Sequence, residues 1–145
     1  MKHNIEQINK LFGDLSDFHL VLFGVSLTIF TLLYSFILSK REELKSISEL
    51  VKTGDKSPIL AQKESFAKKY ITRFKTANQQ TIYIILITFI LFLSSWLSET
   101  IISNNCIQTK TVIIYIISGL TILIIFYSIY IFVKILKHYK EEIKI

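Results

Sequence analysis

The 145-residue chain contains few residues that interrupt helices, with one proline and four glycines. Proline breaks an α-helix and glycine weakens it, so their scarcity favours long continuous helices. The chain also has a single cysteine, Cys106, which cannot form an internal disulfide and therefore excludes a disulfide-rich secreted scaffold. We expect Cys106 to be a free thiol; the alternative is a disulfide between two copies of the chain.

Motifs of catalysis and cofactor binding are also missing from the sequence. It contains no glycine-rich phosphate-binding loop, no nucleophile motif of the G-x-S-x-G type and no cysteine or histidine pair with the spacing of metal ligands. We therefore expect a protein that is not an enzyme, that uses no cofactor and that has no metal site.

Charged residues are absent from three long stretches, residues 18–39, 81–98 and 111–133. Each stretch has at least 18 residues without Asp, Glu, Lys or Arg, which is long enough for a helix to cross about 30 Å of hydrocarbon. The alternative, the core of a soluble bundle, would show shorter apolar runs and a polar face on every helix. The sequence therefore predicts an all-α integral membrane protein with three transmembrane helices.

The 17 Lys and Arg residues are distributed unevenly between these stretches. Ten lie in the connection at residues 40–80 and four follow residue 133, whereas two precede residue 18 and one lies in the connection at residues 99–110. The positive-inside rule then places the 40–80 connection and the C-terminus in the cytoplasm, and the N-terminus and the 99–110 outer loop outside. We expect a multi-pass protein of the bacterial inner (cytoplasmic) membrane.

The cytoplasmic connection at residues 40–80 is predicted to be a basic helical hairpin. Its first arm continues the first transmembrane helix, and Ser57 and Pro58 suit the N-cap and the first position of the second arm. We also expect an amphipathic helix over residues 1–17, which lies at the outer interface or packs on the outer ends of the bundle, and a basic helical tail over residues 134–145.

Basic residues of the hairpin form a cluster with two interpretations. The cluster consists of Arg41, Lys63, Lys68, Lys69, Arg73 and Lys75. It is either a solvated face near anionic lipid head groups or a site for an anionic ligand, such as a nucleotide or the acidic surface of a cytoplasmic sensor protein. Only its two arginines can hold a phosphate in bidentate geometry. Because the net charge of +6 follows from membrane topology, we expect no direct binding of nucleic acid.

Each predicted transmembrane helix carries a stripe of small or hydroxyl-bearing residues at helical spacing. The stripes are Gly24, Thr28, Thr31 and Ser35 in the first helix, Thr81, Thr88, Ser95 and Ser98 in the second, and Ser118, Thr121 and Ser128 in the third. One interpretation is ordinary helix packing, because small residues let backbones approach and hydroxyl groups bond between helices. The other is that one stripe, foremost the first, lines a narrow pore in an oligomer, since three helices cannot enclose a water-filled path alone.

Ionisable residues are absent from the middle of all three spans, which disfavours active transport because transporters usually carry charges or broken helices there. The three histidines, His3, His19 and His138, are predicted to lie at opposite ends of the protein and cannot share one site. We expect Glu99 to approach His19 in an ordinary interfacial contact, and the alternative is a proton switch.

The stretch GVSLTIFTLLYSFILSKREELKSISEL, residues 24–50, combines a Thr/Ser-bearing span with a cytoplasmic helix that begins Lys-Arg-Glu-Glu. In this it resembles small membrane components of bacterial anti-phage (abortive infection) systems, such as the membrane protein of the lambda Rex exclusion pair and that of Kiwa systems. The resemblance implies a membrane effector that answers a cytoplasmic signal of phage infection by permeabilising the inner membrane. The topology is also similar to that of class I holins.

Together these features predict an oligomeric inner-membrane channel or membrane-permeabilising effector in anti-phage defence, gated through its cytoplasmic hairpin. Expected partners are a bilayer with anionic head groups, further copies of the chain, and a cytoplasmic sensor protein or nucleotide ligand. Two alternatives stay open: a non-conducting membrane anchor that recruits a soluble partner, and a holin-like lysis protein.

Overall fold

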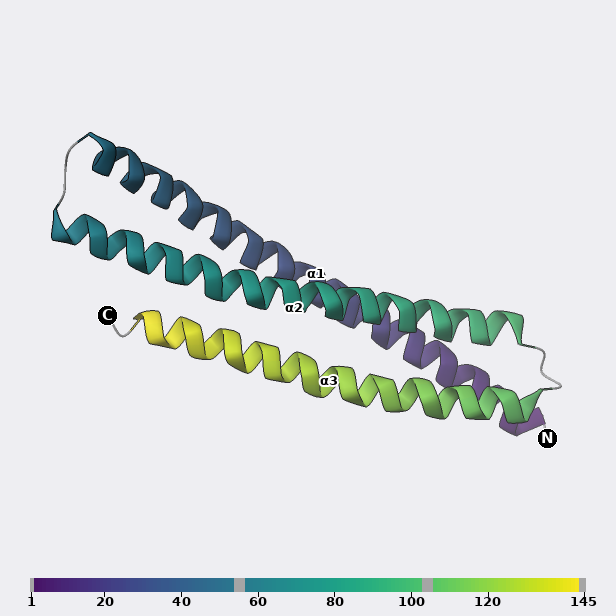
Figure 1. Cartoon of the computed structure of the whole chain (residues 1–145). Helices are drawn as coiled ribbons and strands as arrows, with labels where there is room; N and C mark the ends of the chain where they lie inside the picture. Colours follow the sequence, from purple (N-terminus) through teal and green to yellow (C-terminus); the bar gives the residue numbers. More distant parts are fainter. Residues whose placement is uncertain (1, 54–56, 103–105, 144–145) are drawn as a thin grey trace.

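The computed structural model describes residues 2–53, 57–102 and 106–143 (Figure 1). These residues form three helices and no strand: α1 (Lys2–Lys52), α2 (Pro58–Ile101) and α3 (Ile107–Ile143). Each helix is long and apolar enough to cross a membrane. The predicted all-α fold with three transmembrane helices is confirmed, and the chain is a multi-pass helical membrane protein.

The helices are much longer than the hydrocarbon layer. With 51, 44 and 37 residues, they extend over about 77, 66 and 56 Å at 1.5 Å per residue, against about 30 Å of hydrocarbon. The predicted spans 18–39, 81–98 and 111–133 are therefore the central parts of longer rods. The ends of these rods lie beyond the membrane core.

The N-terminal segment, predicted over residues 1–17 at the outer interface or packed on the bundle, packs on the bundle, but it is not a separate helix. Helix α1 continues through Gly13 without a break into the first span. Phe12 is fully buried and joins a core cluster with residues of α2 and α3. One glycine inside a helix costs only about 1 kcal/mol relative to alanine, and burial of Phe12 offsets this cost. The segment is therefore part of the bundle.

The connections between the helices are short. The outer loop expected over residues 99–110 is shorter than predicted, because α2 continues to Ile101 and α3 begins at Ile107. At the other connection, the Ser57 side chain accepts a hydrogen bond from the Leu60 backbone N–H, and Pro58 opens α2. This N-cap confirms the predicted start of the second hairpin arm. The rest of that turn, residues 54–56, lies outside the described residues.

Figure 1 shows how the three rods are arranged. Helix α2 runs antiparallel to both α1 and α3, and α1 crosses behind α2. Near the N-terminus α1 lies next to α3, whereas at the α1–α2 turn it lies on the far side of α2 from α3. The backbones of α1 and α2 approach each other most closely, and α3 packs at a greater distance. The molecule is thus a tight helical hairpin with a third helix against one side of it.

The side chains inside the bundle explain these different distances. Buried positions of α2 recur at alternating spacings of three and four residues, the pattern of left-handed coiled-coil packing. Thr81, Thr88 and Ser95 occupy equivalent positions seven residues apart and are almost fully buried. Small residues of this kind allow close approach of backbones in lipid. The buried side chains of α3 are mostly isoleucines, such as Ile117 and Ile124, which hold α3 further away.

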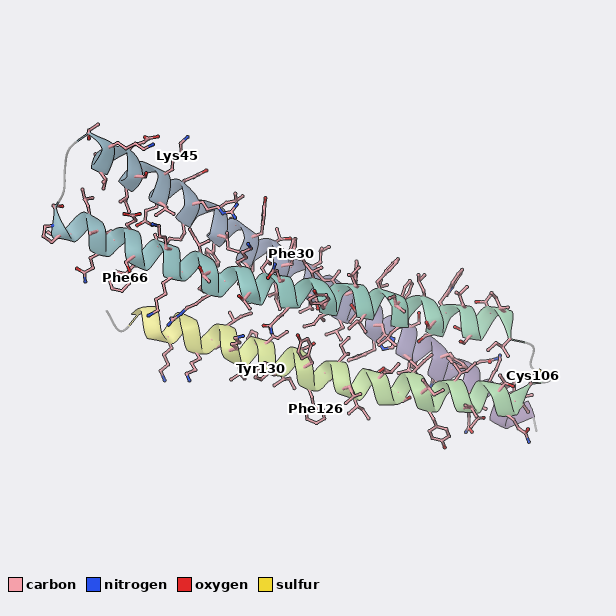
Figure 2. The ribbon with its side chains drawn as sticks, in the orientation of Figure 1. Phe30, Lys45, Phe66, Cys106, Phe126 and Tyr130 are labelled. Carbon is pink, nitrogen blue, oxygen red and sulfur yellow. The ribbon has the colours of Figure 1, made fainter. Side chains whose placement is uncertain are left out.

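The exposed tryptophan and the exposed tyrosines gather at two levels along the bundle. The register follows from contacts between the helices, Asn9 with Lys110, His19 with Thr121 and Phe23 with Phe89. It places exposed Trp96 and Tyr115 at one level, and the exposed tyrosines at a second level about 22 Å further along the bundle. The tyrosines are Tyr34, Tyr83, Tyr127 and Tyr130, the last labelled in Figure 2. Such belts are typical of membrane–water interfaces.

Replacement of Thr88 by leucine tests the close packing inside the bundle. Thr88 has no exposed surface, so Thr88→Leu forces extra atoms between the helices. We expect the free energy of unfolding to fall by about 1–3 kcal/mol, measured by SDS titration in bicelles with circular dichroism. Ile87→Leu, at an exposed neighbouring position, is the control and should change stability by less than about 0.5 kcal/mol. Equal SDS midpoints for both variants would refute tight packing at this position.

Candidate functional site

The stripe of α1 lies on the outside of the bundle. Gly24, Thr28, Thr31 and Ser35 are all exposed, and at 100° per residue they lie roughly opposite the buried face that holds Leu33. A side chain at Gly24 would meet no atom within 4 Å. The hydroxyl groups of Thr28 and Thr31 donate to the carbonyl oxygens of Gly24 and Leu27, at 3.0 and 2.9 Å. These groups are therefore satisfied in lipid and keep free lone pairs for another partner.

The stripes of the other two helices face inward. Thr88, Ser95 and Thr121 are buried, and Ser118 is half-buried. Thr88 and Thr121 each bond a backbone carbonyl one turn earlier in their own helix. The sequence left helix packing and pore lining open for the stripes and put the first foremost for a pore. The structure places the stripes of α2 and α3 in helix packing and leaves that of α1 outside it.

A cavity of about 250 Å³ lies where α1 diverges from α3. Its lining is almost entirely apolar and comes from all three helices, with hydroxyl groups from Ser26, Thr81 and Ser128. This cavity is local: buried isoleucines of α3, such as Ile114 and Ile117, fill the bundle on one side of it, and Leu33, Ile37 and Phe74 fill it on the other. A single copy therefore offers no continuous polar path along its axis within the described residues.

A polar groove lies between the two arms of the hairpin, which are the end of α1 and the beginning of α2. It has a volume of about 420 Å³, and its lining residues are Arg41, Leu44, Lys45, Ser48, Glu49, Lys52, Glu64 and Lys68. Four cationic and two anionic side chains thus line one depression. Lys68 is paired with Glu64 of its own helix at 2.5 Å. Lys45 of the groove is labelled on α1 in Figure 2.

The structure divides the basic cluster that the sequence singled out. Arg41 and Lys68 line the groove. Four others, Lys63, Lys69, Arg73 and Lys75, do not line it. In their place come Lys45 and Lys52, which the sequence analysis did not include. Lys45 and Lys52 could have been identified from the sequence, because they recur at helical spacing with Arg41 and Ser48 along one face of α1.

His19 lies inside the bundle and not in the expected contact with Glu99. It has no exposed surface, and its Nε2 is 2.8 Å from the Thr121 hydroxyl oxygen. That hydroxyl donates its hydrogen to the Ile117 carbonyl at 2.7 Å, so the histidine Nε2–H is the donor. The Glu99 carboxylate lies close to Gly13 instead. Its Oε2 atom would be 3.9 Å from a Cβ atom added at Gly13.

Two buried polar atoms near this bond have no hydrogen-bond partner among the described residues, His19 Nδ1 and Ser95 Oγ. With Nε2 protonated, Nδ1 is an acceptor, whereas the Ser95 hydroxyl has a hydrogen to donate. His19, Ser95 and Thr121 thus form a polar layer across all three helices. The layer depends on the register between the three helices. No local sequence motif determines this register, so the sequence analysis did not find the layer.

A second inter-helix bond joins the beginnings of α1 and α3. Lys110 is 1% exposed, and its ammonium group donates to the Asn9 side-chain oxygen at 2.8 Å. The sequence analysis used Lys110 only as a charge in the outer loop. The structure assigns it a packing role, since its bond fixes the start of α3 against the N-terminal part of α1.

Comparisons of the chain with protein-family models, with curated proteins and with solved structures found no match. The interpretation of the α1 stripe, the groove and the polar layer therefore rests on their geometry and chemistry.

The His19–Thr121 bond can be tested with an isosteric variant. Thr121→Val removes the acceptor and leaves a buried N–H unpaired, so we expect a loss of about 1–2 kcal/mol in unfolding free energy. Thr88→Val is the matched control, because the Thr88 hydroxyl bonds only its own helix. The double variant His19→Phe with Thr121→Val should recover much of the loss. Equal effects of the two single valine variants in the same SDS titration would contradict the assigned bond.

Proposed function

We propose that the protein is an oligomeric channel, or membrane-permeabilising effector, of the bacterial inner membrane whose opening is controlled through the α1–α2 hairpin. The observation that carries this proposal is the position of the α1 stripe. Four small or hydroxyl-bearing residues follow one line on the outer surface of the bundle, in the middle of otherwise apolar surroundings. Packing within one copy does not account for them.

Several copies around a common axis would give this stripe a role. If each copy turns the α1 stripe inward, its hydroxyl groups form a polar lining while the apolar surfaces of α2 and α3 face lipid. Rings of side-chain oxygens are a common lining of narrow pores. Because Thr28 and Thr31 already donate to backbone carbonyls, they present acceptor lone pairs to the axis, which favours passage of cations or water.

The hairpin supplies the proposed control element. Helix α1 is continuous from the stripe to Lys52, so a movement of the hairpin arm is transmitted to the stripe without an intervening joint. The excess of Lys and Arg in this part of the chain supports a cytoplasmic hairpin and an outer N-terminus. The resemblance of residues 24–50 to membrane components of anti-phage systems supports a role in phage defence.

A non-conducting anchor that recruits a soluble partner is the second candidate. It is favoured by the length of the hairpin arms, which extend past the ends of the predicted spans at residues 39 and 81 by about 20 Å or more. Such an anchor would use the groove between these arms and would have no use for the α1 stripe. The two proposals therefore differ in the consequence of changing the stripe.

The double variant Thr28→Leu with Thr31→Leu tests the pore. Two leucines replace the polar lining with apolar side chains that narrow and dewet the path. We expect loss of most of the ion flux from reconstituted liposomes, and of membrane depolarisation in cells measured with a potential-sensitive dye. The control is Leu32→Ile with Phe36→Leu, at exposed positions of α1 that lie about 70° and about 110° around the helix from the stripe, which should retain wild-type flux.

The oligomeric state decides the same question independently. Native mass spectrometry of the protein in nanodiscs should show a complex of several copies. A monomer would refute the channel, because one copy has no polar path. Intact potential in cells that contain the assembled protein under inducing conditions would favour the anchor.

Orientation can be measured with the single native cysteine. Cys106 is exposed in the connection between α2 and α3. We expect a membrane-impermeant maleimide to label it in intact spheroplasts, because this connection is proposed to face outward. In the variant Cys106→Ser with Thr53→Cys, the only thiol lies at the hairpin tip, and labelling should require permeabilisation. The reverse pattern would invert the proposed topology.

A further inference from the structure

The groove between the hairpin arms carries cations without ion-pair partners. Of its four cationic side chains, Lys68 is paired with Glu64. The described residues give Arg41, Lys45 and Lys52 no ion pair or hydrogen bond. The nearby pair of Lys40 with Glu43 lies outside the groove lining. Three cations without an ion-pair partner among the described residues and one carboxylate, Glu49, therefore face the same depression.

These cations are arranged in a way that helix formation alone disfavours. Arg41 and Lys45 are four residues apart on α1, and Lys52 lies seven residues further along the same face, with Ser48 between them. Like charges four residues apart on a helix, here Arg41 and Lys45, repel each other. An anion bound between them relieves this repulsion, so the groove favours a negatively charged ligand.

The donors of the groove fit a phosphate group. Arg41 offers a planar guanidinium that can bind two oxygens of one phosphate, whereas Lys45 and Lys52 add ammonium groups and Ser48 a hydroxyl. The volume of about 420 Å³ lies within the range of small-molecule sites, about 300–1,000 Å³. Two carboxylates in the lining, Glu49 and Glu64, leave a net charge near +2, which a dianion neutralises.

We propose that this groove binds a phosphate-bearing anion of two or more charges, which Arg41, Lys45 and Lys52 of α1 hold and which Lys68 of α2 contacts on exchange of its Glu64 partner, and that the anion thereby sets the relative position of the hairpin arms. The proposal rests on the proposed function in that it makes the hairpin the control element of the channel. The phosphate can belong to a soluble metabolite or to a lipid head group. The groove runs along about 16 Å of α1 from Arg41 to Lys52, which favours a soluble ligand beyond the head-group layer.

Binding is tested on the full-length protein in nanodiscs of phosphatidylcholine, with inorganic pyrophosphate as the probe and isothermal titration calorimetry at low ionic strength as the readout. The variant Lys45→Gln with Lys52→Gln should weaken binding at least about tenfold. The control Lys63→Gln with Lys75→Gln removes the same charge outside the groove and should retain wild-type affinity. Lys45→Arg with Lys52→Arg should rescue binding, since it restores the charge.

A second experiment identifies the source of the phosphate. Thermal unfolding is compared between nanodiscs of phosphatidylcholine and of phosphatidylglycerol. A rise in the unfolding midpoint in phosphatidylglycerol that the groove variant loses and the control keeps would support the site and assign it to lipid. Groove-dependent pyrophosphate binding without this rise would support the site with a soluble ligand.

The proposal is overturned if neither pyrophosphate nor phosphatidylglycerol has a groove-dependent effect, or if both double variants lose binding equally. That result would leave the channel proposal standing, because the stripe variants and the oligomeric state are measured without any ligand.

Discussion

The close approach of α1 and α2 is the constraint on which the rest of the structure depends. In lipid, apolar burial does not drive helices together, so association depends on packing distance and on bonds between helices. Thr81, Thr88 and Ser95 provide a flat line of small side chains along which α1 lies, and each threonine satisfies its hydroxyl on its own helix. Bulkier residues at these positions would separate the arms and remove the narrow groove between their extensions.

Helix α3 is held by different and fewer interactions. Isoleucine side chains fill the space between α3 and the hairpin. Directional bonds join α3 to α1 near one end, from Lys110 to Asn9 and between His19 and Thr121, and further along Lys134 of α3 donates to the Gln80 side-chain oxygen of α2 at 3.5 Å. Towards the other end α1 diverges from α3 (Figure 1), and residues of all three helices line the apolar cavity in that region. The Lys134–Gln80 bond keeps α3 on α2 there, so the divergence separates α1 from α3 and leaves α2 and α3 together.

Much of this fold could be predicted from the sequence, because a charge-free stretch of 18 residues leaves a chain few alternatives in lipid. The Ser57 cap was also predictable, since its bond closes within three residues. The continuation of α1 through residue 17 and of α2 past residue 99 could not be predicted. Neighbouring helices stabilise helical turns there that the isolated segments would not keep. The partner of His19 and the inward direction of two stripes depend on the register and rotation of one helix against another. Neither the register nor the rotation can be derived from the sequence of one helix alone.

The continuity of α1 gives the proposed channel a physical route from signal to pore. The groove residues begin at Arg41 and the stripe ends at Ser35, so about two turns of one unbroken helix separate them. An anion that draws the arms together changes the angle at which α1 crosses α2. Because the stripe lies opposite the buried face of α1, a change of this angle would displace the stripe laterally. A ring of such helices would widen or narrow at its axis by the same movement.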